Sequence, residues 1–298
     1  MAMAKPTEIQ AKPQGVVTQY YELRFAPPVH NIIMKSIVDL SESLKQQPGF
    51  LGLSFKQMVG LSTMVNNFPS AYKGVLRSAY AEAVEDHSLP YFYSLFLRFA
   101  SYSDAQKINL DTWFQKSIMP QLYLFTSKGK KTDIPVSYYA DVFQTIAAGN
   151  REAVYTTPTE IKHFLRNQKD IPEQSLITVN NHLAILDKDM ESFEQKVLPL
   201  LKVAQNTFEP RSDPKNIGQP GDKSNQTYHR AMSTEILRNA FPAGEQRNYM
   251  MHGVWESVWD HENSHLDPRF RKAAMPVAAY AVSGPVEPFY QTHLLMNN

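Results

Sequence analysis

One order of predicted elements occurs twice along the chain of 298 residues, and this repetition restricts the fold more than any other feature. Runs rich in β-branched and aromatic residues indicate strands, and apolar residues spaced three and four apart indicate helices. In the first half we predict strands over 15–23, from 50 to 55 and over 91–100, with helices over 32–44 and 103–119. In the second half we predict strands over 175–186, 248–258 and 286–295, with helices over 190–204, 260–265 and 273–282.

Two halves of similar order indicate an internal duplication, and each half has the order of a split-βαβ, ferredoxin-like unit. Two such units can pair sheet against sheet into a closed barrel, which leaves no exposed sheet edge. The expected fold class is therefore α+β, with duplicated ferredoxin-like units forming a barrel of the dimeric α+β type. The predicted boundaries are a flexible tail over 1–14, a first unit over 15–125, a linker or insertion over 126–172 and a second unit over 173–298. Within these we expect helices near 138–147 and 160–166 and a surface loop over 208–225.

Composition and charge exclude several classes of partner. Thirty basic and twenty-nine acidic side chains give a net charge of +1 without any Lys/Arg block, so we expect no nucleic acid and no membrane as a partner. The absence of cysteine excludes disulfides, iron–sulfur clusters and thiolate zinc sites. The sequence contains neither the apolar stretch of a signal peptide nor an eighteen-residue apolar run, and we expect a soluble, cytoplasmic protein.

The residues with the clearest chemical pattern are two histidines and a glutamate near the end of the chain. His261 and His265 are four residues apart, so a helix places both imidazoles on one face. Glu287 follows far enough along the chain for that helix to end and for the chain to return. Two imidazoles and one carboxylate form a complete ligand set for a mononuclear divalent metal and leave positions open for substrate, water or dioxygen. Iron is the predicted metal because this set suits non-haem oxygen chemistry. We expect Asp260 to cap the helix and His252 to be a possible hydrogen-bond donor to a ligand.

The same residues allow other interpretations. His261-Glu262-x-x-His265 is also the pattern of zinc hydrolases, in which Glu262 is the general base. Glu287 would then be the third zinc ligand, although Asp267 stands where such enzymes continue a buried apolar helix. In a second alternative His265 is the axial ligand of a haem. In a third, both histidines are polar residues on an exposed turn and have no chemical role. In a fourth, the barrel holds no metal and is a non-catalytic module that binds small molecules.

Two segments resemble the sulfur oxygenase reductases. They are residues 259–265 (WDHENSH) and 284–290 (GPVEPFY), and residues 47–53 (QPGFLGL) are similar to a helix-to-strand turn of the wider superfamily. The resemblance implies a duplicated ferredoxin-like fold, a mononuclear non-haem iron bound by His261, His265 and Glu287, a reduced sulfur substrate and a homo-oligomer. Two features differ from that family. The halves are exchanged, because the metal site lies here in the second half, and no cysteine occupies the helix over 193–204 that carries the substrate sulfur in the family.

These patterns together predict an oxidoreductase of the oxygenase type with a mononuclear non-haem iron. Its expected partners are dioxygen and a small substrate, such as an inorganic or reduced sulfur compound, that enters an apolar cavity lined by aromatic residues. The ferrous centre is expected to bind both side by side, while the three protein ligands hold and tune the metal.

Overall fold

The computed structural model describes residues 12–66, 91–126, 128–167, 176–206, 229–242, 244–265 and 267–297. Most of the predicted tail and the whole predicted loop over 208–225 lie outside these ranges. No helix in the described part is long and apolar enough to cross a membrane.

The first unit consists of four long strands and the helices between them. Its elements are β1 (Val17–Phe25), η1 (Pro27–Val29), α1 (His30–Leu44), β2 (Phe50–Asn66), β3 (Tyr91–Phe99), α3 (Tyr102–Gln106), α4 (Leu110–Trp113), η2 (Phe114–Ile118), η3 (Met119–Gln121) and β6 (Tyr139–Asn150). A small hairpin of β4 (Tyr123–Phe125) and β5 (Lys131–Pro135) precedes β6.

The second unit repeats this order. After β7 (Val154–Tyr155) and α5 (Pro158–Asn167) it contains β8 (Ile177–Leu186), η4 (Asp187–Asp189), α6 (Met190–Asn206), β9 (Ser233–Asn239), β10 (Gln246–Trp255), α7 (Val258–Ser264), α8 (Pro268–Ala278) and β11 (Ser283–Asn297).

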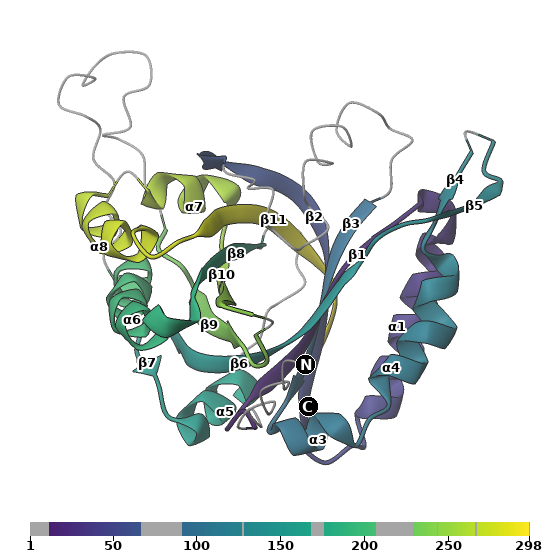
Figure 1. Cartoon of the computed structure of the whole chain (residues 1–298), viewed down its shortest axis with the longest axis horizontal. Coiled ribbons are helices and arrows are strands. Elements are labelled where there is room, and N and C mark those ends of the chain that lie inside the picture. Colours follow the sequence, from purple (N-terminus) through teal and green to yellow (C-terminus); the bar gives the residue numbers. More distant parts are fainter. Residues whose placement is uncertain are drawn as a thin grey trace, which may run out of the picture.

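The strands close into a ring, which confirms the predicted fold class. The order of hydrogen-bonded strands is β6-β1-β3-β2 in the first unit and β11-β8-β10-β9 in the second. In both units the fourth strand along the chain pairs with the first, the first with the third, and the third with the second. The β2–β11 and β6–β9 pairings join the two sheets, and every pairing is antiparallel. Figure 1 shows the resulting barrel, with α1, α3 and α4 on one side and α6, α7 and α8 on the other. Because a single chain supplies both halves, the barrel strands in the described part of the chain leave no long edge for a second copy.

The predicted helix near 138–147 is wrong, because these residues belong to β6. Tyr138, Val142 and Ile146 are spaced like one face of a helix, and a short apolar pattern of this kind cannot by itself distinguish helix from strand. Pairing with β1 and β9 decides the outcome and adds the segment to the first unit, which therefore extends past residue 125. The helix near 160–166 is confirmed as α5. The predicted helix over 103–119 is divided into α3, α4 and η2, and its N-cap is Ser101.

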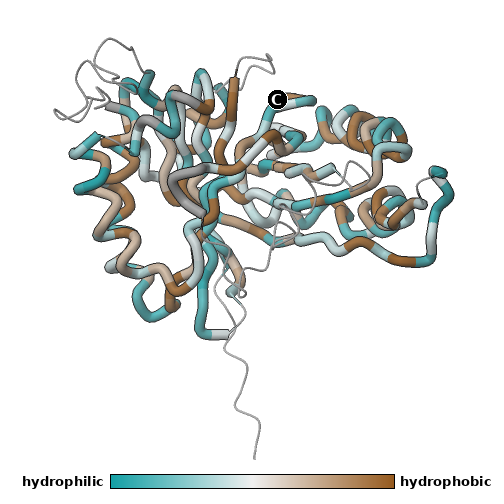
Figure 2. Tube along the Cα trace, turned by 90° about the horizontal axis from the view of Figure 1, so that it is seen from above, coloured by the Kyte–Doolittle hydropathy of each residue, from teal (hydrophilic) through white to brown (hydrophobic). Residues whose placement is uncertain are grey.

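Each unit buries an apolar layer between its sheet and its helices. In the first unit Ile33, Ile37 and Leu44 of α1 pack on the outer face of the sheet. In the second unit Phe193 and Val197 of α6 do the same. Figure 2 shows apolar residues along the helix faces that meet the sheet. The cavity described below lies in this layer of the second unit.

The inner face of the barrel combines an apolar cluster, which includes Tyr20, Phe96 and Phe143, with buried polar groups. Three buried contacts each join one residue of the first unit to one of the second. They are Glu22 Oε1 to His182 Nε2 at 3.4 Å, Lys56 Nζ to His252 Nε2 at 3.1 Å and Arg98 NH2 to Glu235 Oε1 at 2.8 Å. Buried charges are tolerated when they are paired, so these contacts tie the two units together from within.

Candidate metal centre

Helix α7 starts directly after β10 and carries both histidines. Its N-cap is Ser257, whose Oγ accepts a hydrogen bond from the Asp260 amide at 3.1 Å. Asp260 is thus three positions inside the helix and not the cap that the sequence predicts; its carboxylate accepts from Ser257 Oγ and from the His229 amide. The bond from the Asp260 amide to Ser257 Oγ satisfies one of the backbone donors at the helix start, which lack partners within the helix. A new helix, α8, begins at Pro268 with Asp267 as its N-cap.

Glu287 comes from the last strand, at a point where the regular pairing is interrupted. The register between β11 and β2 shifts between Val286 and Pro288, so Glu287 lies in an irregular segment. Such irregularities re-aim side chains and are frequent beside active sites. Gly284 precedes it with φ 87°, and a Cβ there would lie 2.5 Å from the His182 carbonyl oxygen, which only glycine avoids.

The three side chains converge as the sequence predicts. One ligand atom from each of His261, His265 and Glu287 lies within 4.8 Å of the others. Glu287 Oε2 is 4.0 Å from His261 Nε2 and 3.6 Å from His265 Nε2. The rings are fixed by aromatic neighbours, since His261 packs edge-on against Trp255 and His265 against Phe270, each with centroids 5.2 Å apart.

Electrostatics at this cluster favour a cation between the three groups. Burial, and next the neighbouring His265, lower the pKa of His261 well below its usual value, so its imidazole is neutral at pH 7 with a free lone pair. Burial raises the pKa of Glu287, although His265, Ser62 and Asn181 each oppose that shift. Glu287 Oε2 is buried and receives no hydrogen bond in the described part of the chain. An ionised carboxylate in such a place is costly unless a cation balances it.

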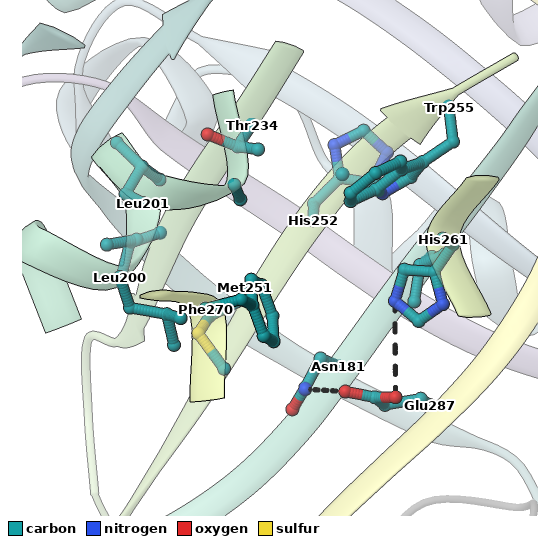
Figure 3. Close-up of a pocket in the computed structure, with 14 residues that line it drawn as sticks. Asn181, Leu200, Leu201, Thr234, Met251, His252, Trp255, His261, Phe270 and Glu287 are labelled. Carbon is teal, nitrogen blue, oxygen red and sulfur yellow. Dashed lines mark hydrogen bonds and ion pairs between the residues drawn. The ribbon is translucent and has the colours of Figure 1, made fainter. Parts of the chain in front are cut away.

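Two residues that the sequence does not single out hold Glu287 in place. Asn181 of β8 donates from Nδ2 to Glu287 Oε1, which turns Oε2 towards the histidines (Figure 3). Ser62 of β2 also hydrogen-bonds the carboxylate, so the first unit supports a site whose three ligands all come from the second. Neither residue carries a motif, and only the strand order reveals them.

A cavity of about 70 Å³ opens beside Glu287 and His261. Its walls come from β8, β9 and β10 on one side and from α6 and α8 on the other (Figure 3). Most lining residues are apolar, and they are Val179, Leu200, Leu201, Ala204, Ile236, Met251, Trp255 and Phe270. The predicted apolar, aromatic-lined cavity is therefore present next to the predicted ligands.

His252 and Glu262 are the two other residues that the sequence singles out near this site. His252 borders the cavity, and its ring contacts Lys56 and Glu235. Glu262 is half-buried and lies near enough to raise the pKa of Glu287. It follows His261 directly on α7, where the zinc-hydrolase interpretation requires it.

Two family models match separate parts of the chain. Residues 16–104 match the family described as ABM-like domain. Residues 146–293 match the family described as CT0912-like, C-terminal domain. The comparison with curated proteins finds no match.

Similar solved structures share the whole two-unit architecture. A putative monooxygenase from Fusobacterium nucleatum aligns over 96% of this chain and 95% of its own at 8% identity and a TM-score of 0.54. A second protein so named, from Lactobacillus acidophilus, aligns over 95% and 97% at 9% identity and a TM-score of 0.52. An anthrone oxidase-like protein aligns over 97% and 95% at 11% identity and a TM-score of 0.55. At these identities the likeness establishes the fold alone.

Proposed function

We propose that the protein is an oxidoreductase of the oxygenase type that binds one iron ion through His261, His265 and Glu287. The observation that carries this proposal is the buried, unbonded Oε2 of Glu287 facing two imidazole nitrogens at 3.6 and 4.0 Å. Three donors of this kind suit a first-row divalent metal and leave coordination positions open for other molecules. The names of two structural neighbours agree with oxygenase chemistry, and each name applies to its own protein.

The geometry admits such an ion once the three side chains move closer together. Donor atoms around a metal at about 2.1 Å lie roughly 3.0–3.4 Å apart. The two carboxylate-to-imidazole distances exceed this range by a few tenths of an ångström. The three ligand atoms lie within 4.8 Å of one another, so the imidazoles as well as the carboxylate would move towards the ion.

The chain's own residues would bind and shield the reactants. A bound iron supplies the redox chemistry that activates dioxygen. Asn181 and Ser62 keep the carboxylate of Glu287 oriented, and the packed ring of Trp255 holds the His261 imidazole. The apolar walls offer water few hydrogen-bond partners beside the reactants, which limits side reactions of activated oxygen. The resemblance of residues 259–265 and 284–290 extends the proposal to a reduced sulfur substrate.

Haem and zinc, the two alternative cofactors, would each require something different of this site. Haem requires far more space than the roughly 70 Å³ present beside the histidines in the described part of the chain. Zinc hydrolysis requires Glu262 as base, which makes Glu262 the discriminating residue. A homo-oligomer remains part of the proposal, and it must use surfaces other than the barrel strands.

Three variants test the proposal. We expect His261→Ala and Glu287→Ala to lose both bound iron and substrate-dependent oxygen uptake while keeping the circular-dichroism spectrum of the parent. Glu262→Ala is the matched control on the same helix, and it should keep both properties. Full iron content in the first two variants would refute the ligand assignment. Zinc in the parent protein, together with a Glu262→Ala variant that keeps its metal but loses activity, would favour hydrolysis.

A further inference from the structure

The orientation of the His261 imidazole depends on the rings packed around it. Its Nδ1 is buried and makes no hydrogen bond in the described part of the chain. A metal-binding histidine is usually oriented by a hydrogen bond at the ring nitrogen that does not bind the metal. Three rings stand edge-on to this imidazole instead, with centroids 5.2, 4.9 and 5.2 Å away, and they belong to Trp255, His265 and Phe289. Because His265 is itself a proposed ligand, Trp255 and Phe289 are the neighbours that can hold the imidazole in place.

The position of the Trp255 indole depends in turn on Gly253. Side chains alternate along β10, so residues 253 and 255 face the same layer, and both line the cavity. A Cβ on Gly253 would lie 2.9 Å from Trp255 Nε1, well inside the roughly 3.5–4.0 Å at which two heavy atoms attract most strongly. The indole beside His261 (Figure 3) therefore passes over Gly253 at a distance that a residue with a side chain would not allow.

Neither residue of this contact is free to withdraw. Gly253 is paired on both sides, with Val179 of β8 and with Thr234 of β9, so its backbone is held within the sheet. The Trp255 side chain is buried in an apolar cluster. Close-packed interiors transmit a displacement of this kind. A methyl group at position 253 would therefore push the indole, and the indole would push the His261 imidazole.

We infer that Gly253 is a positioning residue of the metal centre: the space left by its missing side chain lets the Trp255 indole lie against His261 and hold that imidazole towards Glu287. The consequence for metal binding rests on the proposed function. The contact between the three residues exists without a metal, so it can be measured separately.

Gly253→Ala tests the contact, because it adds one methyl group at a position whose φ is not positive and which alanine can therefore adopt. Gly60→Ala on β2 is the matched control. Its Cβ would lie 3.7 Å from the Phe289 ring, an ordinary contact, although Phe289 packs on His261 at the same centroid distance as Trp255 does. Trp255→Leu supplies a rescue background, since leucine has no atom where Nε1 lies.

The first readout is nuclear magnetic resonance of metal-free protein, labelled with nitrogen-15 in its three tryptophans and carbon-13 in its nine histidines. The indole signal of Trp255 and the ring signal of His261 are assigned through Trp255→Leu and His261→Gln. We expect Gly253→Ala to shift both signals and Gly60→Ala to shift neither. In the Trp255→Leu background, Gly253→Ala should leave the His261 signal where Trp255→Leu alone places it.

An unmoved His261 signal in Gly253→Ala, an equal shift in Gly60→Ala, or the same shift in the Trp255→Leu background would overturn the inference. A Gly253→Ala chain that unfolds on its own but folds together with Trp255→Leu would support the same contact. Unfolding in both backgrounds would overturn it.

The second readout is the affinity for ferrous iron, measured by competition with a chelator under anaerobic conditions. We expect Gly253→Ala to bind iron about tenfold more weakly, as groups that orient metal ligands commonly do, and Gly60→Ala to bind as the parent does. Adding Gly253→Ala to Trp255→Leu should change the affinity less than about twofold, because the contact is already gone. Unchanged affinity in Gly253→Ala, with iron bound by the parent, would overturn the inference. A parent that binds no iron would refute the proposed function alone, and the resonance experiment then decides the inference by itself.

Discussion

His182 makes the stability of the barrel depend on pH. This histidine is buried on the inner face of the ring, and burial lowers its pKa from 6.5 to about 3. Its folded pKa lies below its unfolded pKa, so the unfolded chain binds the proton more readily. Above pH 6.5 His182 is neutral in both the folded and the unfolded chain, so it does not change the free energy of unfolding. As the pH falls from 6.5 towards 3, the unfolded chain binds the proton and the folded protein is progressively destabilised. Between pH 7 and pH 5 the loss amounts to about 2 kcal/mol, from 1.5 pH units at 1.36 kcal/mol each.

The matched perturbation is His182→Gln, which keeps a polar side chain that cannot titrate. Urea denaturation of both proteins at pH 7 and pH 5, with a chelator present, gives the free energy of unfolding at each pH. Other titrating groups, His261 included, affect both proteins alike, so the variant should lose about 2 kcal/mol less than the parent over this interval. An equal loss would show that His182 does not titrate as described. A larger loss in the variant would show that Glu22, 3.4 Å away, holds His182 protonated and that their attraction outweighs burial.

Three further substitutions test other parts of the account. Phe193→Ala removes a fully buried ring between α6 and the second sheet and should cost about 3–5 kcal/mol of unfolding free energy in urea denaturation. Ser257→Ala removes the N-cap of α7 and should cost about 1 kcal/mol while weakening metal binding, measured by competition with a chelator; unchanged stability would count against the cap. Arg98→Met leaves Glu235 as a buried charge and should cost about 3–5 kcal/mol, whereas adding Glu235→Leu to it should restore most of that loss.

The sequence predicts those elements whose period is unambiguous. Helix α1 was predictable because its apolar spacing fits only a helix, and strand β3 because its run is short and rich in aromatic residues. Strand β6 was not, since residues 138–146 fit the helical spacing and only its long-range partners make it a strand. The prediction that Asp260 caps α7 was wrong for a similar reason. Serine and aspartate are both good N-caps, and the end of β10 decides whether α7 begins after Ser257 or after Asp260.

The residues of the candidate site also fall into those that the sequence predicts and those that it does not. His261 and His265 are related by local helical spacing, and Glu287 by a motif, so their convergence could be predicted. Asn181 and Ser62 reach Glu287 only because β8 and β2 flank β11 in the ring. Such a contact depends on strand order across the whole chain, which residue spacing does not encode.

The central claim is tested most directly by the metal content of protein purified without added metal, together with its absorption spectrum. We predict about one iron per chain and no Soret band, and we predict that Glu287→Ala purified in parallel contains almost none. Zinc in place of iron would shift the function to hydrolysis with Glu262 as base, and a Soret band would indicate haem bound through His265. A protein without any metal, even after incubation with ferrous iron under anaerobic conditions, would contradict the account and leave a module that binds small molecules.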